Sequence, residues 1–230
     1  MDSRGEKDFE KFSKIAVKFY DYITRGTLIK RQNEEIAQFL ISKITTGNLL
    51  DVGTGPGRLF IEISKLKSDI ELYGLDISNS MIEQAQKNLK NKKVNLRVGN
   101  IEKTEYEDNF FDIITATGNL FLWDHPQECL EEIRRILKFN GSTYLFETYN
   151  DYDEHEYKIA LKSTLKKESI PRRILIPYFL NNQLDFTYKK SEIEKIINQT
   201  SFKNSYNIDK IKLSGLPIWL KIELKKTNHN

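Results

Sequence analysis

Short apolar segments typical of strands alternate with helix-like segments along the first 150 residues, and this rhythm constrains the fold more than any other feature. Helices are predicted where apolar residues recur at spacings of three and four. Consecutive strand–helix–strand units join parallel strands by right-handed crossovers, and their helices cover both faces of the sheet. The sequence therefore predicts a doubly wound α/β fold. The five expected strands lie at residues 49–52, 70–75, 94–98, 111–116 and 142–148.

Further segments flank this core, and we expect them to belong to the same domain. An apolar face at helical spacing predicts a helix over residues 6–23. After residue 150 the alternation ends. Two strand-like segments at 203–213 and 217–226, joined by a Ser-Gly-Leu-Pro turn, predict an antiparallel hairpin at the sheet edge. The four expected parts are 1–33, 34–150, 151–200 and 201–230.

The composition excludes several classes of protein. Hydrophobic residues make up 39% of the 230 residues, enough to bury a core. A single cysteine, Cys129, permits neither an internal disulfide nor a cluster of thiolate metal ligands. The 36 basic and 33 acidic residues nearly balance, so the overall charge favours neither a nucleic acid nor a membrane partner. The chain starts with charged residues and contains no apolar stretch of spanning length. We therefore expect a cytoplasmic protein without a membrane partner.

A cluster of glycines follows the first predicted strand and is the strongest sign of a binding site. Gly53, Gly55 and Gly57 come directly after a strand that carries Asp51 near its end. Glycine lets a ligand approach the backbone, and ligands in such sheets bind beyond the carboxyl ends of the strands. The simpler alternative is a tight turn without a ligand. The spacing G-x-G-x-G differs from the nicotinamide fingerprint and from the phosphate loop. A buried carboxylate at Asp51 favours a cationic ligand group.

This loop and four later blocks, in order over about residues 45–150, resemble the class I S-adenosylmethionine (SAM)-dependent methyltransferases; the later blocks are residues 74–81, 99–101, 111–119 and 130–142. The resemblance implies a mostly parallel, seven-stranded Rossmann-like sheet with an antiparallel C-terminal strand, and an N-terminal helical lid within residues 1–33. It also implies that Asp76 binds the ribose hydroxyls and that Asn100, where the family commonly has Asp, accepts the adenine amino group. The residues that it implies for binding SAM, and the product S-adenosylhomocysteine, are Asp51, Gly53, Thr54, Gly55, Gly57, Arg58, Asp76, Ile77, Met81, Asn100, Ile101, Ala116 and Thr117.

Two residues are candidates for a direct part in methyl transfer. Tyr20 stands in a Tyr-Asp pair that resembles a frequent element of the family's lid helix, where the ring covers the sulfonium by a cation–π contact. Its alternative role is simple packing. His125, near the exit of the fourth strand, is either a general base or a structural residue at a helix start. The three histidines are scattered, so we expect no metal site.

Four further residues are candidates for contact with the methyl acceptor. Trp123 follows the fourth strand, and its alternative role is core packing; Tyr149 stands at the end of the fifth strand. Arg172 and Arg173 lie in the 151–200 insertion, where family members often build substrate caps. Paired guanidinium groups suit an anionic substrate group, and a solvated charged turn is their alternative.

The expected activity is transfer of a methyl group to an O, N, S or C nucleophile of a small molecule by in-line displacement. The [DNS]-P-P-[YFW] motif used on planar nitrogens is absent, as are the paired cysteines of RNA cytosine enzymes. The main alternative is a tRNA- or protein-modifying methyltransferase, or a SAM-binding subunit that needs a partner. A nicotinamide oxidoreductase is the third hypothesis. We expect a monomer or a homodimer.

Overall fold

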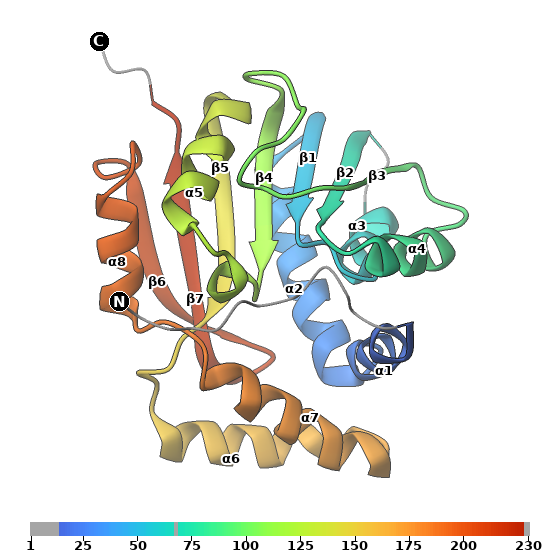
Figure 1. Cartoon of the computed structure of the whole chain (residues 1–230). Coiled ribbons are helices and arrows are strands. Elements are labelled where there is room, and N and C mark those ends of the chain that lie inside the picture. Colours follow the sequence, from blue (N-terminus) through green and yellow to red (C-terminus); the bar gives the residue numbers. More distant parts are fainter. Residues whose placement is uncertain (1–13, 67–68, 228–230) are drawn as a thin grey trace.

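The computed structural model describes residues 14–66 and 69–227, which form a seven-stranded sheet with helices on both faces (Figure 1). The strand order is β3-β2-β1-β4-β5-β7-β6. Strands β1 to β5 pair in parallel, and β7 runs antiparallel to β5 and β6. The predicted fold, with its reversed C-terminal strand, is therefore confirmed. The strands are β1 (Gly47–Val52), β2 (Ile70–Asp76), β3 (Val94–Val98), β4 (Phe111–Thr117), β5 (Leu137–Thr148), β6 (Tyr206–Leu213) and β7 (Leu216–Lys225).

The helices of the described residues pack against two apolar faces of this sheet. They are α1 (Lys14–Thr24), α2 (Thr27–Lys43), α3 (Arg58–Leu66), α4 (Asn79–Asn88), α5 (Pro126–Ile136), α6 (Glu154–Leu165), α7 (Ile170–Leu184) and α8 (Lys190–Asn198), with a 3-10 turn at Leu120–Leu122. One core cluster joins the sheet to α2, α3, α6 and α7. The other joins it to α5 and α8. Each sheet face is thus buried by side chains from several helices.

The direction of the chain across the sheet changes at β1. Val52, the last residue of β1, pairs with Leu75 of β2 on one side and with Ala116 of β4 on the other. In open α/β sheets, ligands bind beyond the carboxyl ends of the strands at such a switch point. The glycine cluster directly follows Val52 and so lies there. Figure 1 shows these carboxyl ends directed toward α6 and α7, with α1 to one side.

Strand β5 begins at Leu137, five residues before the predicted start at 142. The Asn140-Gly141 pair, which is typical of a turn, lies inside this strand. Asn140 has a positive φ of 63°, and the pairing of β5 with β4 shifts register between Phe111 and Ile113. The backbone N–H of Asn140 donates to the carbonyl of Lys226. A partner distant in sequence therefore converts the turn signal into a bulge within a paired strand.

Two helices differ in extent from what their sequence indicates. The apolar stretch 170–180, interrupted by Pro177, forms most of α7, and Pro177 lies inside that helix. Proline removes one backbone donor, but Ile176, Leu180 and Leu184 are buried and hold the helix against the core. The predicted helix 6–23 corresponds to α1, and its first residues lie outside the described ranges. Among the described helices, none has the length and apolarity that crossing a bilayer requires.

Candidate active site

The glycine loop after β1 leaves one side of its backbone open. A Cβ atom at Gly53 would lie 2.0 Å from Nδ2 of Asn119, and one at Gly57 would lie 2.7 Å from Cδ1 of Leu89. Those two glycines are required by close packing. Gly55 differs, because a Cβ atom there would have Cε1 of Tyr20, 3.9 Å away, as its nearest side-chain neighbour. Its φ of 51° also favours glycine. The loop can therefore accept a ligand at Gly55.

Asp76, at the end of β2, connects this loop to the start of α4. Its Oδ2 accepts a 2.8 Å hydrogen bond from the backbone N–H of Gly55, and its Oδ1 accepts one of 2.9 Å from Ser78. The Ser78 hydroxyl in turn caps α4. Burial raises the pKa of Asp76, and the two N–H donors oppose that rise. A carboxylate in this position keeps lone pairs free for further donors.

Asp51 lies deeper, inside β1. Burial raises the pKa of this carboxyl to about 7; the Thr54 hydroxyl opposes the rise and the charge of Asp76 adds to it. Because the charges of the two carboxyl groups act on each other, their surroundings favour a positive group. The residues present therefore fit a ligand that carries both a cation and hydroxyl donors.

Tyr20 of α1 lies across the open side of the loop. Besides its approach to Gly55, its ring meets Phe179 of α7 edge-on, with centroids 5.6 Å apart. Burial and the charges of Asp76 and Asp51 raise the pKa of Tyr20 to about 12, so its phenol is neutral at physiological pH. The lid helix, the glycine loop and the second-strand carboxylate thus converge on one place.

Asp21, the next residue, ties α1 to the loop. Its buried carboxylate accepts hydrogen bonds from Arg58 and, at 3.0 Å, from Asn88, and it forms an ion pair with Arg25 at 2.9 Å. Nδ2 of Asn88 also donates to the carbonyl of Pro56, within the glycine loop, at 2.8 Å. We call Asp21, Arg58 and Asn88 the lid latch. Arg58, predicted to bind SAM, is engaged in this latch, and neither Asp21 nor Asn88 was predicted as a site residue.

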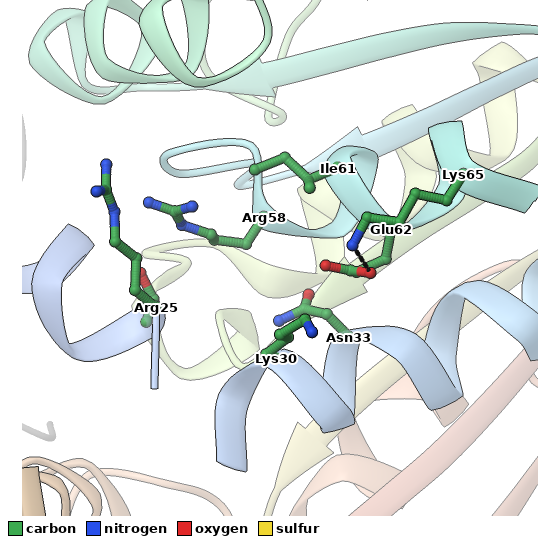
Figure 2. A pocket seen from close by; sticks show the side chains of 8 residues that line it. Arg25, Lys30, Asn33, Arg58, Ile61, Glu62 and Lys65 are labelled. Atoms are coloured by element: carbon green, nitrogen blue, oxygen red, sulfur yellow. Dashed lines mark hydrogen bonds and ion pairs between the residues drawn. The ribbon is translucent and has the colours of Figure 1, made fainter. Parts of the chain in front are cut away.

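A pocket of about 200 Å³ lies on the outer side of the latch, between the α1–α2 turn and α3 (Figure 2). Its cations are already paired: Lys65 with Glu62 at 2.5 Å, and Arg58 and Arg25 with Asp21. Neither Gly55, Tyr20 nor Asp76 lines it, so it is separate from the open side of Gly55. Its lining residues are Thr24, Arg25, Lys30, Asn33, Arg58, Ile61, Glu62 and Lys65.

The exit of β4 brings together polar groups that the sequence did not single out. Asn119 is buried, and its Nδ2 donates to the carbonyl of Val52 at 2.6 Å. The backbone N–H groups of Asn119 and Leu120 donate to Glu147, whose pKa burial raises to about 8 against those two donors. Gln183 of α7 donates to the carbonyl of Gly118 at 3.4 Å. One feature of the sequence could have identified Glu147 as a site residue: it is an acid that directly follows the apolar residues 144–146 of a predicted strand.

The remaining residues predicted for the cofactor lie at or after the carboxyl ends of β2, β3 and β4. Ile77 and Met81 follow β2, the second of them inside α4, Asn100 and Ile101 follow β3, and Ala116 and Thr117 end β4. Met81, Ile101 and Ala116 are buried, whereas Ile77 is 39% exposed. Asn100 is exposed and its Oδ1 accepts from the backbone N–H of Glu102, two residues on. The hydroxyl of Thr117 is buried and has no hydrogen-bond partner among the described residues.

Helices α1, α6 and α7 together form what we call the cap. Two of the residues predicted for the substrate have structural partners there. Arg172 stacks 4.3 Å above the ring centroid of Tyr22 and donates to its carbonyl, while Arg173 donates to the carbonyls of Lys166 and Glu168. These contacts join α7 to α1 and to the turn before α7. Their cationic groups are therefore committed to backbone acceptors.

His125, Trp123 and Tyr149 lie on the side of the sheet that carries α5. His125 is exposed, and the nearby carboxylate of Glu102, 3.1 Å from Nδ1, raises its pKa. Glu128 brings a third possible metal donor within 4.8 Å of these two, which the scattered histidines did not indicate. Trp123 packs against the second core cluster. The Tyr149 hydroxyl donates to the carbonyl of Pro217.

Comparison with known proteins places the chain in a family. The model of a methyltransferase domain matches residues 45–208. A carboxy-S-adenosyl-L-methionine synthase of Campylobacter jejuni is 28% identical over 221 residues, covering 86% of this chain and 93% of that protein. An uncharacterized methyltransferase of Bacillus subtilis is 31% identical over 119 residues, half of this chain and 66% of that protein.

The fold is also that of a solved structure. A candidate S-adenosyl-L-methionine-dependent methyltransferase of Methanococcus maripaludis superimposes with a TM-score of 0.74 at 26% identity, over 98% of this chain and 99% of that one. The predicted family, enzyme class and cofactor are confirmed. The chain belongs to the methyltransferase domain family and is an S-adenosyl-L-methionine-dependent methyltransferase.

Proposed function

We propose that this enzyme methylates an uncharged small molecule, with the cofactor held between the glycine loop and Tyr20. The observation that carries the proposal is the convergence of Tyr20, Asp51 and Asp76 at the open side of Gly55. Asp76 would accept the ribose hydroxyls. Asp51 would favour the positive charge of the ligand, and the neutral Tyr20 ring would cover it.

The bound cofactor supplies a methyl group on a positively charged sulfur. The chain's own part is to orient that group and to exclude water, which supports catalysis by proximity. Tyr20 and Phe179 would close the site from the cap, and Asp21 would keep Tyr20 in place through the lid latch. None of these steps requires a metal or a strong base.

The polarity of the β4 exit supports an uncharged acceptor. The side chains that meet there are the amides of Asn119 and Gln183 and the buried carboxyl of Glu147, whose pKa of about 8 keeps it mostly neutral at pH 7. Thr117 Oγ1 and Asn119 Oδ1 are buried without partners among the described residues, so they are available to an acceptor or to the cofactor.

Carboxylation of the cofactor is the second candidate, favoured by the similarity to the Campylobacter synthase along most of both chains. A carboxylate attached to the cofactor would call for a nearby cation. Arg58 and Arg172, two cations that contact α1, are committed to Asp21 and Tyr22. That commitment favours methyl transfer.

Calorimetry and mass spectrometry test both candidates. We expect SAM and S-adenosylhomocysteine to bind, and incubation with SAM and pooled cell metabolites to yield S-adenosylhomocysteine and a methylated small molecule. A gain in cofactor mass equal to a carboxyl group would support the second candidate instead. Methylation confined to tRNA or protein fractions would overturn the small-molecule proposal.

A further inference from the structure

Helix α7 is apolar on three sides, but only two of them have partners. One side is buried in the core. A second side reaches the active site, where Phe179 meets Tyr20 and Gln183 meets Gly118. The third side, spaced at i, i+4 and i+8, faces solvent. This outer stripe consists of Ile170, Ile174 and Tyr178, which are 75%, 71% and 68% exposed.

The neighbouring cap elements extend this apolar surface. Helix α1 packs beside α7 and exposes Ile15, Phe19 and Tyr22. Of the twelve large hydrophobic side chains that are exposed in residues 14–66 and 69–227, eight lie on α1, α6 and α7 or just after α7. Such a concentration on one part of a protein marks an interaction surface.

Cations surround the N-terminal end of the outer stripe. Residues 162–184 contain five Lys and Arg residues and one acid, a net charge of +4, against +3 for the whole chain. That acid, Glu168, is buried and accepts a 2.6 Å hydrogen bond from the backbone of Leu28. The same contact brings the cations around the α1–α2 turn and the start of α2 close to those around the start of α7. We call this set the basic collar: Arg25, Lys30, Arg31, Lys166, Lys167 and Arg173. Two of its members also pair with acids, Arg25 with Asp21 and Lys30 with Glu34.

We propose that the outer stripe and the basic collar dock the enzyme on the surface of an anionic phospholipid bilayer. Apolar side chains would enter the interface while the surrounding lysines and arginines meet the lipid phosphates, a combination typical of helices that lie on membranes. The overall charge of +3 hides this local asymmetry. The proposal concerns the cap surface and does not depend on the identity of the methyl acceptor.

Two other partners, a nucleic acid and a second copy of this chain, would each suit only one part of this surface, either the basic collar or the outer stripe. A nucleic acid would satisfy the collar but leave the stripe of isoleucines in water. A second copy of this chain would cover the stripe but bring two collars of like charge together. An anionic bilayer satisfies both parts. Because Phe179 and Gln183 lie on the same helix, docking would set the exit of β4 close to the bilayer.

Sedimentation with lipid vesicles tests the proposal. We expect the full chain to bind vesicles of phosphatidylcholine with phosphatidylglycerol, to bind pure phosphatidylcholine weakly, and to be released by salt. Ile170→Ser with Ile174→Ser should reduce the bound fraction about tenfold. The control is Phe139→Ser with Leu66→Ser, which replaces two exposed side chains outside the cap (52% and 48% exposed, against 75% and 71% for the two stripe residues) and should leave binding unchanged.

A charge variant keeps the test valid if the stripe variant fails to fold. Lys166→Gln with Lys167→Gln alters only exposed residues and should weaken anionic vesicle binding several-fold. Failure to bind anionic vesicles would overturn the proposal, as would equal losses in the stripe and Phe139–Leu66 variants. Conversion of a dimer to a monomer by the stripe variant would assign the surface to a second copy. Binding to tRNA but not to vesicles would assign it to nucleic acid.

Discussion

The glycine-loop half of the site and the cap half are built in different ways. The loop half uses backbone groups of neighbouring turns, as when the N–H groups of Gly55 and Ser78 hold Asp76. The cap half uses side chains that meet across long sequence separations, such as Arg172 with Tyr22 and Asp21 with Arg58. We infer that the loop half sets affinity for the cofactor, whereas the cap adjusts closure and access.

A side chain on the open side of Gly55 should disturb cofactor binding by the glycine-loop half of the site more than any other change. Gly55→Val would place a side chain where we propose the ligand lies and would strain a positive φ, so cofactor affinity should fall more than about 100-fold by calorimetry. Gly215→Val is the control, because Gly215 also has a positive φ and nothing within 4 Å. An equal loss of affinity in both variants would attribute the effect to backbone strain.

Removal of the Asp76 carboxylate should have the next largest effect. Asp76→Ala leaves the proposed ribose hydroxyls without a charged acceptor, which costs about 1.5–3 kcal/mol, or roughly 10- to 100-fold in Kd. Asp112→Ala is matched to it, since Asp112 also accepts a backbone hydrogen bond, from Asn48, at the opposite edge of the sheet. An unchanged Kd in Asp76→Ala would refute the assigned role.

The pH dependence of cofactor binding tests the role of Asp51. Because the folded pKa is about 7 and the ordinary value is 3.8, ionising this carboxyl destabilises the ligand-free protein as pH rises between those values. The cationic cofactor should prefer the ionised form, so its affinity at about pH 6 should be roughly tenfold below the plateau above pH 7. Asp51→Asn should flatten this profile. A wild-type profile as flat as that of the variant would contradict the prediction.

Weakening the lid latch should have the smallest effect on cofactor affinity. It tests the cap half of the site separately from the glycine-loop half. Asp21→Asn weakens the pairing with Arg58 but keeps the shape of the side chain, so cofactor affinity should fall about fivefold. In a double-mutant cycle with Tyr20→Ala, the two losses should be non-additive, because Asp21 acts by positioning Tyr20. Glu34→Gln, which removes an exposed pair with Lys30, is the control and should be neutral. Additive losses would show that the latch is only structural.

The two halves also differ in how far the sequence predicted them. The strand, the three glycines and Asp76 lie within 30 residues of one another; their local pattern indicated the turn and a ligand site, and the resemblance to a known family implied the ligand class. Arg58 shows where local reasoning stops, since its partner Asp21 is 37 positions away. The turn signal at Asn140-Gly141 was similarly overridden by pairing with Lys226.

By itself, the order of apolar strands, helices and glycines determined the α/β fold and the position of the ligand loop, because these depend on periodicity and backbone conformation over short spans. The enzyme class came from the resemblance of the ordered motif blocks to a known family. Only the tertiary structure decided which polar side chains face the site and which hold the lid. Asn119, Gln183, Glu147 and the latch acquire their partners from distant strands and helices. Those contacts depend on burial and charge in three dimensions, which spacing along the chain does not encode.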